Sequence, residues 1–226
     1  MSEKSKKLIL GIDEAGRGPI VGPMVIAGVM IEEGQEQELK DLGVKDSKLL
    51  QPKQRERLFP KIQKLAKKVM VIEVSPQEID ARFAVATNLN VLEASKMAEL
   101  INKMKPDVAV LDCPSPNIKS FKEKVLAKYL EHTCEIIAEH YADKNYPVVS
   151  AASIIAKVIR DSRIKEIEKE VGYPIGVGYT HDAKTIEFVE RALSEKDHLD
   201  KYIRKSWLTF KRIKDGKAQK KLSDEW

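Results

Sequence analysis

The stretch LILGIDEAGRGP, residues 8–19, joins a short apolar run to two adjacent acids and then to a Gly-Arg-Gly-Pro turn. Residues 8–12 have the pattern of a buried strand, because short apolar runs bounded by turn residues usually form strands. Asp13 and Glu14 follow directly. Two carboxylates at that place are costly to desolvate unless a metal ion or a basic partner meets them. The stretch therefore predicts a strand that delivers acidic groups to a site.

The glycine-rich segment AGRGPIVG, residues 15–22, resembles a dinucleotide-binding loop only superficially. Gly16 and Gly18 would need a third glycine where Val21 stands, and the following residues 23–31 have the character of a strand rather than a helix. We interpret the region as strand, turn and strand. Its glycines permit positive φ angles or close approach of a ligand to the backbone.

The rest of the chain alternates between strand and helix patterns. Strands are also expected at 69–74, 108–111 and 133–138, and helices at 52–67, 90–104, 118–129, 148–171, 183–193 and 206–213. This predicts an α/β protein with a mixed five-stranded central sheet flanked by helices. Residues 1–182 would form the main domain, and residues 183–226 a helical, basic C-terminal region packed on it, with a tail.

The composition is that of a soluble globular protein, with 226 residues, 42% of them hydrophobic and 33% charged. No apolar run approaches the ~18 residues needed to span a membrane. The apolar stretch near the N-terminus is too short for a signal peptide, so we expect a cytoplasmic protein. Cys113 and Cys134 make no zinc pattern, and the four histidines lack metal-binding spacing. Any metal would therefore be a hard ion bound by oxygen.

Positive charge is concentrated near the C-terminus. Residues 196–221 contain ten Lys and Arg against three acids, a net of +7, whereas the whole chain carries +5. A basic segment beside a slightly acidic body indicates a polyanionic partner. A solvated helix face is the plainer alternative. Tyr202, Trp207 and Phe210, interleaved with these charges, favour nucleic acid.

Acidic residues come after three of the predicted strands: Asp13 and Glu14, then Asp112, then Asp143. Carboxylates at the ends of neighbouring strands can converge at one edge of a sheet. Like charges raise each other's pKa, so such a cluster needs cations. Its natural use is to hold two divalent metals ~3.5–4 Å apart for phosphodiester cleavage. Taken singly, Asp112 could be a turn former and Asp143 an exposed loop acid.

Several motifs together resemble the type 2 ribonuclease H family, and its archaeal members most closely. They occur in the family's order and span nearly the whole chain: GIDEAGRGPIVGPMV (11–25), VKDSKLL (44–50), LDCPS (111–115), AEHYADKNYPVVSAASIIAKVIRD (138–161), GVGYTHD (176–182) and KSWLTFKRI (205–213). The first motif combined with PVVSAASIIAKV is the most specific part of this resemblance.

The resemblance implies a ribonuclease-H-like fold and hydrolysis of the RNA strand in RNA–DNA hybrids. It also implies incision 5′ to single ribonucleotides in duplex DNA, leaving 3′-hydroxyl and 5′-phosphate ends. The family's catalytic, metal-binding carboxylates correspond to Asp13, Glu14, Asp112 and Asp143, with Mg²⁺ or Mn²⁺ as cofactor. A monomer is expected.

Substrate-binding residues follow from the same resemblance. The Gly16-Arg17-Gly18 turn would contact the 2′-hydroxyl of the ribonucleotide, and Tyr179 would stack on the neighbouring sugar. A tight hairpin and a half-buried loop anchor are the alternatives. Lys48 and Lys157 would meet phosphates, unless they are ordinary surface lysines. Thr180 and His181 depart from the Pro-Ser of archaeal relatives, which leaves the details of substrate contact open.

Two other functions compete with this one. A catalytically silent nucleic-acid-binding protein would need only the basic tail, and the intact carboxylates argue against it. A transposase- or resolvase-like enzyme of the same fold would act on DNA. The Gly-Arg-Gly turn and Tyr179 favour ribonucleotide recognition instead.

The last residues, GKAQKKLSDEW, partly match a peptide that binds sliding clamps. Gln219, Leu222 and Trp226 occupy three of the four anchor positions, and Glu225 replaces the first aromatic residue. Such a tail would order on binding and insert its apolar anchors into a pocket. Archaeal members of the family are thought to use this mode, whereas a disordered Lys-rich tail is the alternative.

Overall fold

The computed structural model describes residues 6–44, 50–130, 133–195 and 199–223. It contains two compact units. The first comprises the chain up to Ala15 together with Val25–Glu73 and Thr87–Ile159. The second comprises Gly16–Met24, Val74–Ala86 and the chain from Arg160 onward, and the boundary expected at residue 182 falls inside it. No helix within the described ranges is both long and apolar enough to cross a membrane.

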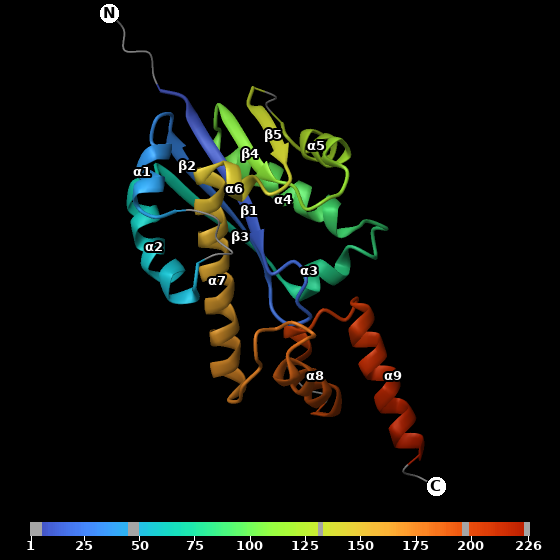
Figure 1. Cartoon of the computed structure of the whole chain (residues 1–226). Helices are drawn as coiled ribbons and strands as arrows, with labels where there is room; N and C mark the ends of the chain where they lie inside the picture. The colour runs from blue at the N-terminus through green and yellow to red at the C-terminus, as the bar shows by residue number, and fades with distance from the viewer. Residues whose placement is uncertain (1–5, 45–49, 131–132, 196–198, 224–226) are drawn as a thin grey trace, which may run out of the picture. The chain divides into compact units, whose positions relative to one another are not determined.

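A five-stranded sheet in the order β3-β2-β1-β4-β5 forms the centre of the first unit (Figure 1). Strand β1 is antiparallel to β2 and parallel to β4, and β4 is parallel to β5. The prediction of a mixed sheet is therefore confirmed. The strands are β1 (Leu8–Ala15), β2 (Met24–Glu32), β3 (Lys68–Val74), β4 (Val108–Asp112) and β5 (Glu135–Glu139).

Strand β1 is longer than its apolar run, and this corrects the expectation that Asp13 and Glu14 come after the strand. They lie within it, paired with Ala27 and Ile26 of β2. The antiparallel ladder continues because backbone pairing depends on N–H and C=O groups and not on side-chain polarity. The two acids are thus held by regular strand geometry, with their side chains on opposite faces of the sheet.

Helices cover both faces of this sheet. Helices α1 and α2 and the first part of α7 share one hydrophobic cluster with β1 and β2, whereas α4 packs with α5 (Figure 1). The helices with residues in this unit are α1 (Glu36–Asp41), α2 (Pro52–Leu65), α4 (Leu89–Met104), α5 (Ile118–Leu126), α6 (Ala142–Asn145) and α7 (Pro147–Val171), which continues into the second unit.

The close approach of α7 to the sheet depends on small residues. A Cβ atom at Gly11 of β1 would lie only 2.4 Å from the backbone carbon of Val148. Ala151 and Ala152 are fully buried on the same helix. With no bulky side chain between them, the helix and the strand pack backbone to backbone, which brings the next turn of α7 near the end of β1.

The second unit has its own core. Its buried residues include Ile20, Ile164, Phe188 and Phe210. Its elements are α3 (Pro76–Ala81), the second part of α7, α8 (Ala183–Glu195), a short 3-10 helix (Leu199–Tyr202) and α9 (Leu208–Ser223). The short helices of both units were not predicted, and α9 is longer than the expected helix at 206–213.

Candidate active site

Adjacent parallel strands place two of the predicted carboxylates together. Ile12 of β1 is in register with Leu111 of β4, so Asp13 and Asp112 are the next residues along the two strands. Asp112 ends β4 and Asp13 lies two residues before the end of β1, so both lie toward the carboxyl ends of their strands, where active sites of open α/β sheets are usually found. Asp13 is only 4% exposed, and Asp112 is half-buried.

The environment of Asp13 is electrostatically unfavourable for a carboxylate. Burial raises its pKa well above the usual value, and the negative charges of Glu14 and Asp112 raise it further. A hydrogen bond from Ser153 and the positive charge of Lys157 act in the opposite direction, with smaller effects. Three carboxylates are therefore close enough to repel one another, and a cation would relieve that repulsion.

The fourth carboxylate, Asp143, lies on the short helix α6. Tyr141 adopts a left-handed conformation (φ 57°) just before this helix, which turns the chain after β5. The backbone N–H of Ala142 then donates a 2.8 Å hydrogen bond to Oδ1 of Asp112. This bond ties α6 to the end of β4. Asp143, the next residue, is 2% exposed, so the chain brings a fourth acid to the same end of the sheet.

Helix α7 contributes a residue that sequence reasoning missed. Ser153 is fully buried, and its side chain is hydrogen bonded to Asp13. Nζ of Lys157, one helical turn later, donates a 2.7 Å hydrogen bond to Oγ of Ser153. The i, i+4 spacing of these two residues next to a run of alanines was a visible signal. Lys157 thus contacts the acidic cluster through Ser153, and its predicted contact with phosphate stays a prediction.

The donor chemistry of this cluster suits a hard divalent cation, because all four side chains offer oxygen atoms only. The mutual repulsion at Asp13 agrees with such a role. Across the described ranges, however, no three His, Cys, Asp or Glu side chains already stand in an arrangement that could hold a metal ion.

The second unit contains the predicted glycine-rich turn and Tyr179. Gly16 has a positive φ of 77°, which explains why glycine stands there. A Cβ atom at Gly18 would lie 3.7 Å from Cε1 of Tyr179, so the tyrosine ring packs against the turn. The carbonyl oxygen of Gly178 accepts hydrogen bonds from the N–H groups of Ile20 and Val21. The structure therefore brings these predicted substrate-binding residues together.

Tyr179 is half-buried and has two further neighbours. The guanidinium of Arg160 lies 5.3 Å from the centre of its ring. The ring of His181 stacks on it at 5.5 Å between centroids. His181 itself is exposed, so one face of this pair is accessible to solvent.

Some predicted residues cannot be placed. Lys48 and Trp226 lie outside the described residues. Gln219 and Leu222 lie on α9, but their side chains are also outside what the structure describes. Their assignments remain predictions.

Comparisons with known proteins agree with the motifs. The model of the Ribonuclease HII family matches residues 10–210. The chain is 46% identical over 217 residues to the Ribonuclease HII of Methanococcus maripaludis (strain C6), covering 94% of this chain and 90% of the relative.

Solved structures give the same result. The crystal structure of the ribonuclease H2 from Pyrococcus horikoshii OT3 is similar with a TM-score of 0.83 and 39% identity, over 92% of this chain and 97% of that one. The PCNA:RNase HII complex from Archaeoglobus fulgidus is similar with a TM-score of 0.79 and 35% identity, over 91% and 96% of the two chains.

Proposed function

The chain belongs to the ribonuclease HII family and is a ribonuclease H, and on that premise we propose its substrates and its mechanism. It hydrolyses the RNA strand of RNA–DNA hybrids, and it incises duplex DNA on the 5′ side of single embedded ribonucleotides. The products carry 3′-hydroxyl and 5′-phosphate ends. The observation that carries the proposal is the cluster of mutually repelling carboxylates around the buried Asp13, toward the carboxyl ends of β1 and β4.

Asp13, Glu14, Asp112 and Asp143 would hold the metal ions, Mg²⁺ or Mn²⁺. Bound divalent metals supply an activated water and stabilise the leaving oxygen in this type of hydrolysis. The chain's own contribution is to fix the ligands. The hydroxyl of Ser153 restrains Asp13, and the N–H of Ala142 restrains Asp112.

The turn formed by Gly16, Arg17 and Gly18 would recognise the 2′-hydroxyl of the ribonucleotide, with Tyr179 against the neighbouring sugar. Support comes from the packing of Tyr179 against Gly18. A protein must contact the 2′-hydroxyl to distinguish RNA from DNA at a single nucleotide. Backbone groups suit this task because they can approach the sugar closely where no side chain intervenes.

The duplex on either side would be bound through its phosphates. Lys211, Arg212 and Lys214 are exposed on α9, in a segment with a net positive charge. Contacts of this kind lose affinity as the salt concentration rises. They position the duplex but carry no sequence preference.

The test uses a DNA duplex containing one ribonucleotide, an RNA–DNA hybrid and an all-DNA duplex, each incubated with and without Mg²⁺. We expect metal-dependent cleavage of the first two and none of the third. Mass spectrometry of the products identifies the cut position and the two ends. Cleavage of the all-DNA duplex would favour a DNA-directed enzyme of the same fold. Binding of all three duplexes without cleavage would favour a silent binding protein.

A sliding clamp is the proposed protein partner. The similar protein from Archaeoglobus fulgidus was solved in complex with PCNA, a sliding clamp. In this chain Gln219, Leu222 and Trp226 match three of four anchor positions. Deleting residues 219–226 and measuring clamp binding by calorimetry tests the assignment. We expect binding to the full-length chain and none after the deletion; equal binding by both proteins would place the contact elsewhere.

A further inference from the structure

Arg204 belongs to the basic segment of the sequence, yet its side chain is completely buried in the second unit. Within the described part of the chain, its hydrogen bonds all go to backbone carbonyl oxygens. Nη2 donates to Gly16 at 2.6 Å, Nη1 to Arg17 at 2.8 Å, and Nε and Nη2 to Gly22 at 3.1 and 2.9 Å. One guanidinium therefore binds both ends of the glycine-rich turn.

Keeping this charge in the interior opposes folding. Burial, and after it the positive charge of Arg160, lowers the pKa of Arg204 to about 9. The side chain still carries its charge at neutral pH, because the carbonyl oxygens replace the water it has lost. A buried charge is weak evidence for a stabilising role, so the position of Arg204 points to a role in the turn that it binds.

Trp207 binds the next carbonyl group of the same turn. Its indole Nε1 donates a 3.0 Å hydrogen bond to the carbonyl oxygen of Gly18. The guanidinium of Arg204 lies 5.0 Å from the centre of the indole ring. Two side chains three residues apart therefore bind the carbonyl groups of three consecutive residues, Gly16, Arg17 and Gly18.

The direction of these carbonyl groups fixes the direction of the neighbouring N–H groups. In a trans peptide the C=O of one residue and the N–H of the next point in opposite directions, and no peptide bond in the described residues is cis. The carbonyl groups of Gly16 and Arg17 point toward Arg204. The N–H groups of Arg17 and Gly18 consequently point to the opposite face of the turn.

We infer that Arg204 and Trp207 are positioning residues, which orient the peptide planes of the turn so that the N–H groups of Arg17 and Gly18 face the 2′-hydroxyl of the substrate. The inference rests on the proposed function, because it assumes that the turn binds that hydroxyl. The positive guanidinium also polarises these peptides, which strengthens the N–H groups as donors. In this role both side chains act through the backbone of the turn, Arg204 from a completely buried position.

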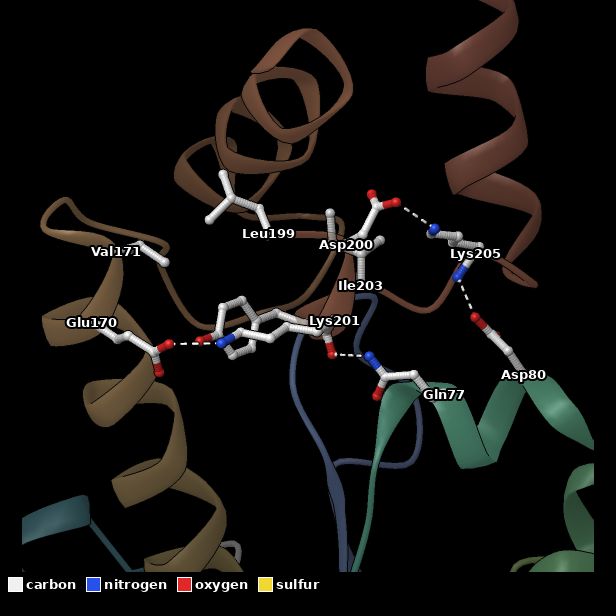
Figure 2. Close-up of a pocket in the computed structure, with 10 residues that line it drawn as sticks. Gln77, Asp80, Glu170, Val171, Leu199, Asp200, Lys201, Ile203 and Lys205 are labelled. Carbon is white, nitrogen blue, oxygen red and sulfur yellow. Dashed lines mark hydrogen bonds and ion pairs between the residues drawn. The ribbon is translucent and has the colours of Figure 1, made fainter. Parts of the chain in front are cut away.

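The segment that carries Arg204 is anchored independently of the guanidinium. Figure 2 shows the anchors in the pocket beside it: Nζ of Lys201 contacts Glu170 at 2.7 Å, and Gln77 donates to the carbonyl oxygen of Lys201 at 2.7 Å. The backbone N–H of Lys205 donates to Asp80 at 2.8 Å (Figure 2). Shortening the side chain of Arg204 should therefore leave the segment in place.

The test combines protein variants with substrate variants. Arg204→Lys keeps the positive charge but loses the planar fork that binds several carbonyl groups at once. Trp207→Phe keeps an aromatic ring but loses the N–H donor. Lys205→Ala is the matched control, because it changes the neighbouring residue and removes a charge without touching the turn. Each protein is assayed under single-turnover conditions on a duplex with one ribonucleotide and on the same duplex with 2′-fluoro in place of the 2′-hydroxyl.

We expect Arg204→Lys to slow cleavage of the 2′-hydroxyl substrate about tenfold, because a tenfold change in rate corresponds to the loss of one modest interaction in the transition state. Cleavage of the 2′-fluoro substrate should slow less than about twofold. Trp207→Phe should show the same pattern with a loss of about threefold, and it serves as the test if Arg204→Lys fails to fold. Lys205→Ala should change both rates by the same small factor.

Equal losses on the two substrates would assign Arg204 and Trp207 a general structural role and overturn the inference, because only a residue acting through the 2′-hydroxyl shows this coupling. Failure of the proposed function gives a different result. In that case the unmodified protein would cleave the two substrates equally well, or neither of them.

Discussion

The two candidate sites of this chain use side chains and backbone in opposite ways. In the first unit, carboxylate side chains from β1, β4 and α6 form the proposed reactive surface, and backbone or hydroxyl groups support them. In the second unit, a backbone turn forms the proposed recognition surface, and the side chains of Arg204 and Trp207 support it. A substitution thus acts directly on the chemistry in the first site and through peptide orientation in the second.

The two sites also differ in the groups that surround their central charge. Burial and like charges shift both central groups toward neutrality: the pKa of Asp13 is raised, and that of Arg204 is lowered. Arg204 has carbonyl oxygens around it that compensate its charge. Asp13 lies beside two other acids. The chain itself thus supplies hydrogen-bond acceptors for the buried charge of Arg204, whereas the carboxylate site is suited to receive a cation.

Removing one carboxylate from the first site should have the largest effect. Asp112→Asn keeps an oxygen that can accept the hydrogen bond from the N–H of Ala142, so we expect normal folding. The loss of charge should lower the Mg²⁺-dependent cleavage rate by roughly 10³-fold or more, because electrostatic stabilisation is usually a dominant part of catalysis. Single-turnover cleavage and a thermal melt measure the two quantities.

Glu135→Gln is the matched control for this variant. It also replaces a carboxylate by an amide, but on the exposed first residue of β5, at the opposite end of the sheet. It should cleave at the normal rate. If Asp112→Asn retained cleavage within tenfold of the unmodified chain at saturating Mg²⁺, Asp112 would not belong to the catalytic cluster.

Distorting the recognition turn should have a smaller effect. Alanine at Gly16 would have to adopt a φ of 77°, and its Cβ would lie 2.7 Å from the carbonyl oxygen of Pro23. The turn must shift, and small displacements of a positioning element cost up to about 10²-fold in rate. We expect Gly16→Ala to slow cleavage at a single ribonucleotide by roughly tenfold to a hundredfold.

Gly34→Ala is the control that distinguishes displacement of the recognition turn from backbone strain alone. Gly34 also has a positive φ, 96°, but a Cβ there would meet no atom within 4 Å. The substitution should cost about 1 kcal/mol of stability and leave the cleavage rate unchanged. Similar kinetic losses in both variants would show that strain, and not the position of the turn, controls the rate.

Much of this organisation could be predicted from the sequence, because strand and helix patterns are local. All five strands were predicted close to their observed places, and the four acids were identified as a set. The far end of β1 was missed because Asp13 and Glu14 break the apolar pattern while the backbone ladder continues. The short helix α3 was missed although Ser75 caps it and Pro76 begins it, since helices of one or two turns depend on tertiary packing.

The positioning residues could not be predicted, because their roles depend on contacts across long stretches of chain. Arg204 was counted among the ten Lys and Arg of residues 196–221, and only the fold reveals that it is buried against a turn 182 to 188 residues away in the sequence. Ser153 stands among small residues in the sequence of α7, and its spacing to Lys157 does not show which acid it contacts. Its hydrogen bond to Asp13 follows from the packing of α7 on β1.

Removing the hydroxyl that restrains Asp13 should reduce activity modestly. Ser153→Ala deletes one hydrogen bond to a buried carboxylate and leaves Lys157 without that acceptor. Loss of one hydrogen bond to a charged group corresponds to about 1.5–3 kcal/mol. Since a bound metal would partly replace the restraint, we expect a loss of roughly threefold to tenfold in rate and a higher Mg²⁺ concentration for half-maximal activity.

The control for this variant is Ser162→Ala, on the exposed side of the same helix, where the hydroxyl contacts only Glu166 among the described residues. Its Mg²⁺ dependence should match that of the unmodified chain. An unchanged Mg²⁺ dependence in Ser153→Ala as well would exclude Ser153 from the support of the metal ligands.

The smallest expected effect concerns stability in the absence of divalent metal. The pKa of Asp13 is raised in the folded chain, first by burial and then by Glu14 and Asp112. An acid of this kind weakens folding once it ionises. The loss begins as the pH rises above its unfolded pKa of about 3.9 and is complete above its folded pKa. Asp13→Asn removes the penalty, so its Tm near pH 7.5 in EDTA should exceed that of the unmodified chain by a few degrees. The difference should shrink as the pH falls toward 4, where the carboxyl is protonated in both states.

Glu33→Gln is the control. It removes a charge from an exposed turn residue and should shift Tm by less than about 1 °C. A lower Tm for Asp13→Asn at pH 7.5 would mean that the surroundings of Asp13 stabilise its carboxylate. The two sites would then not differ in how the chain compensates their buried charges.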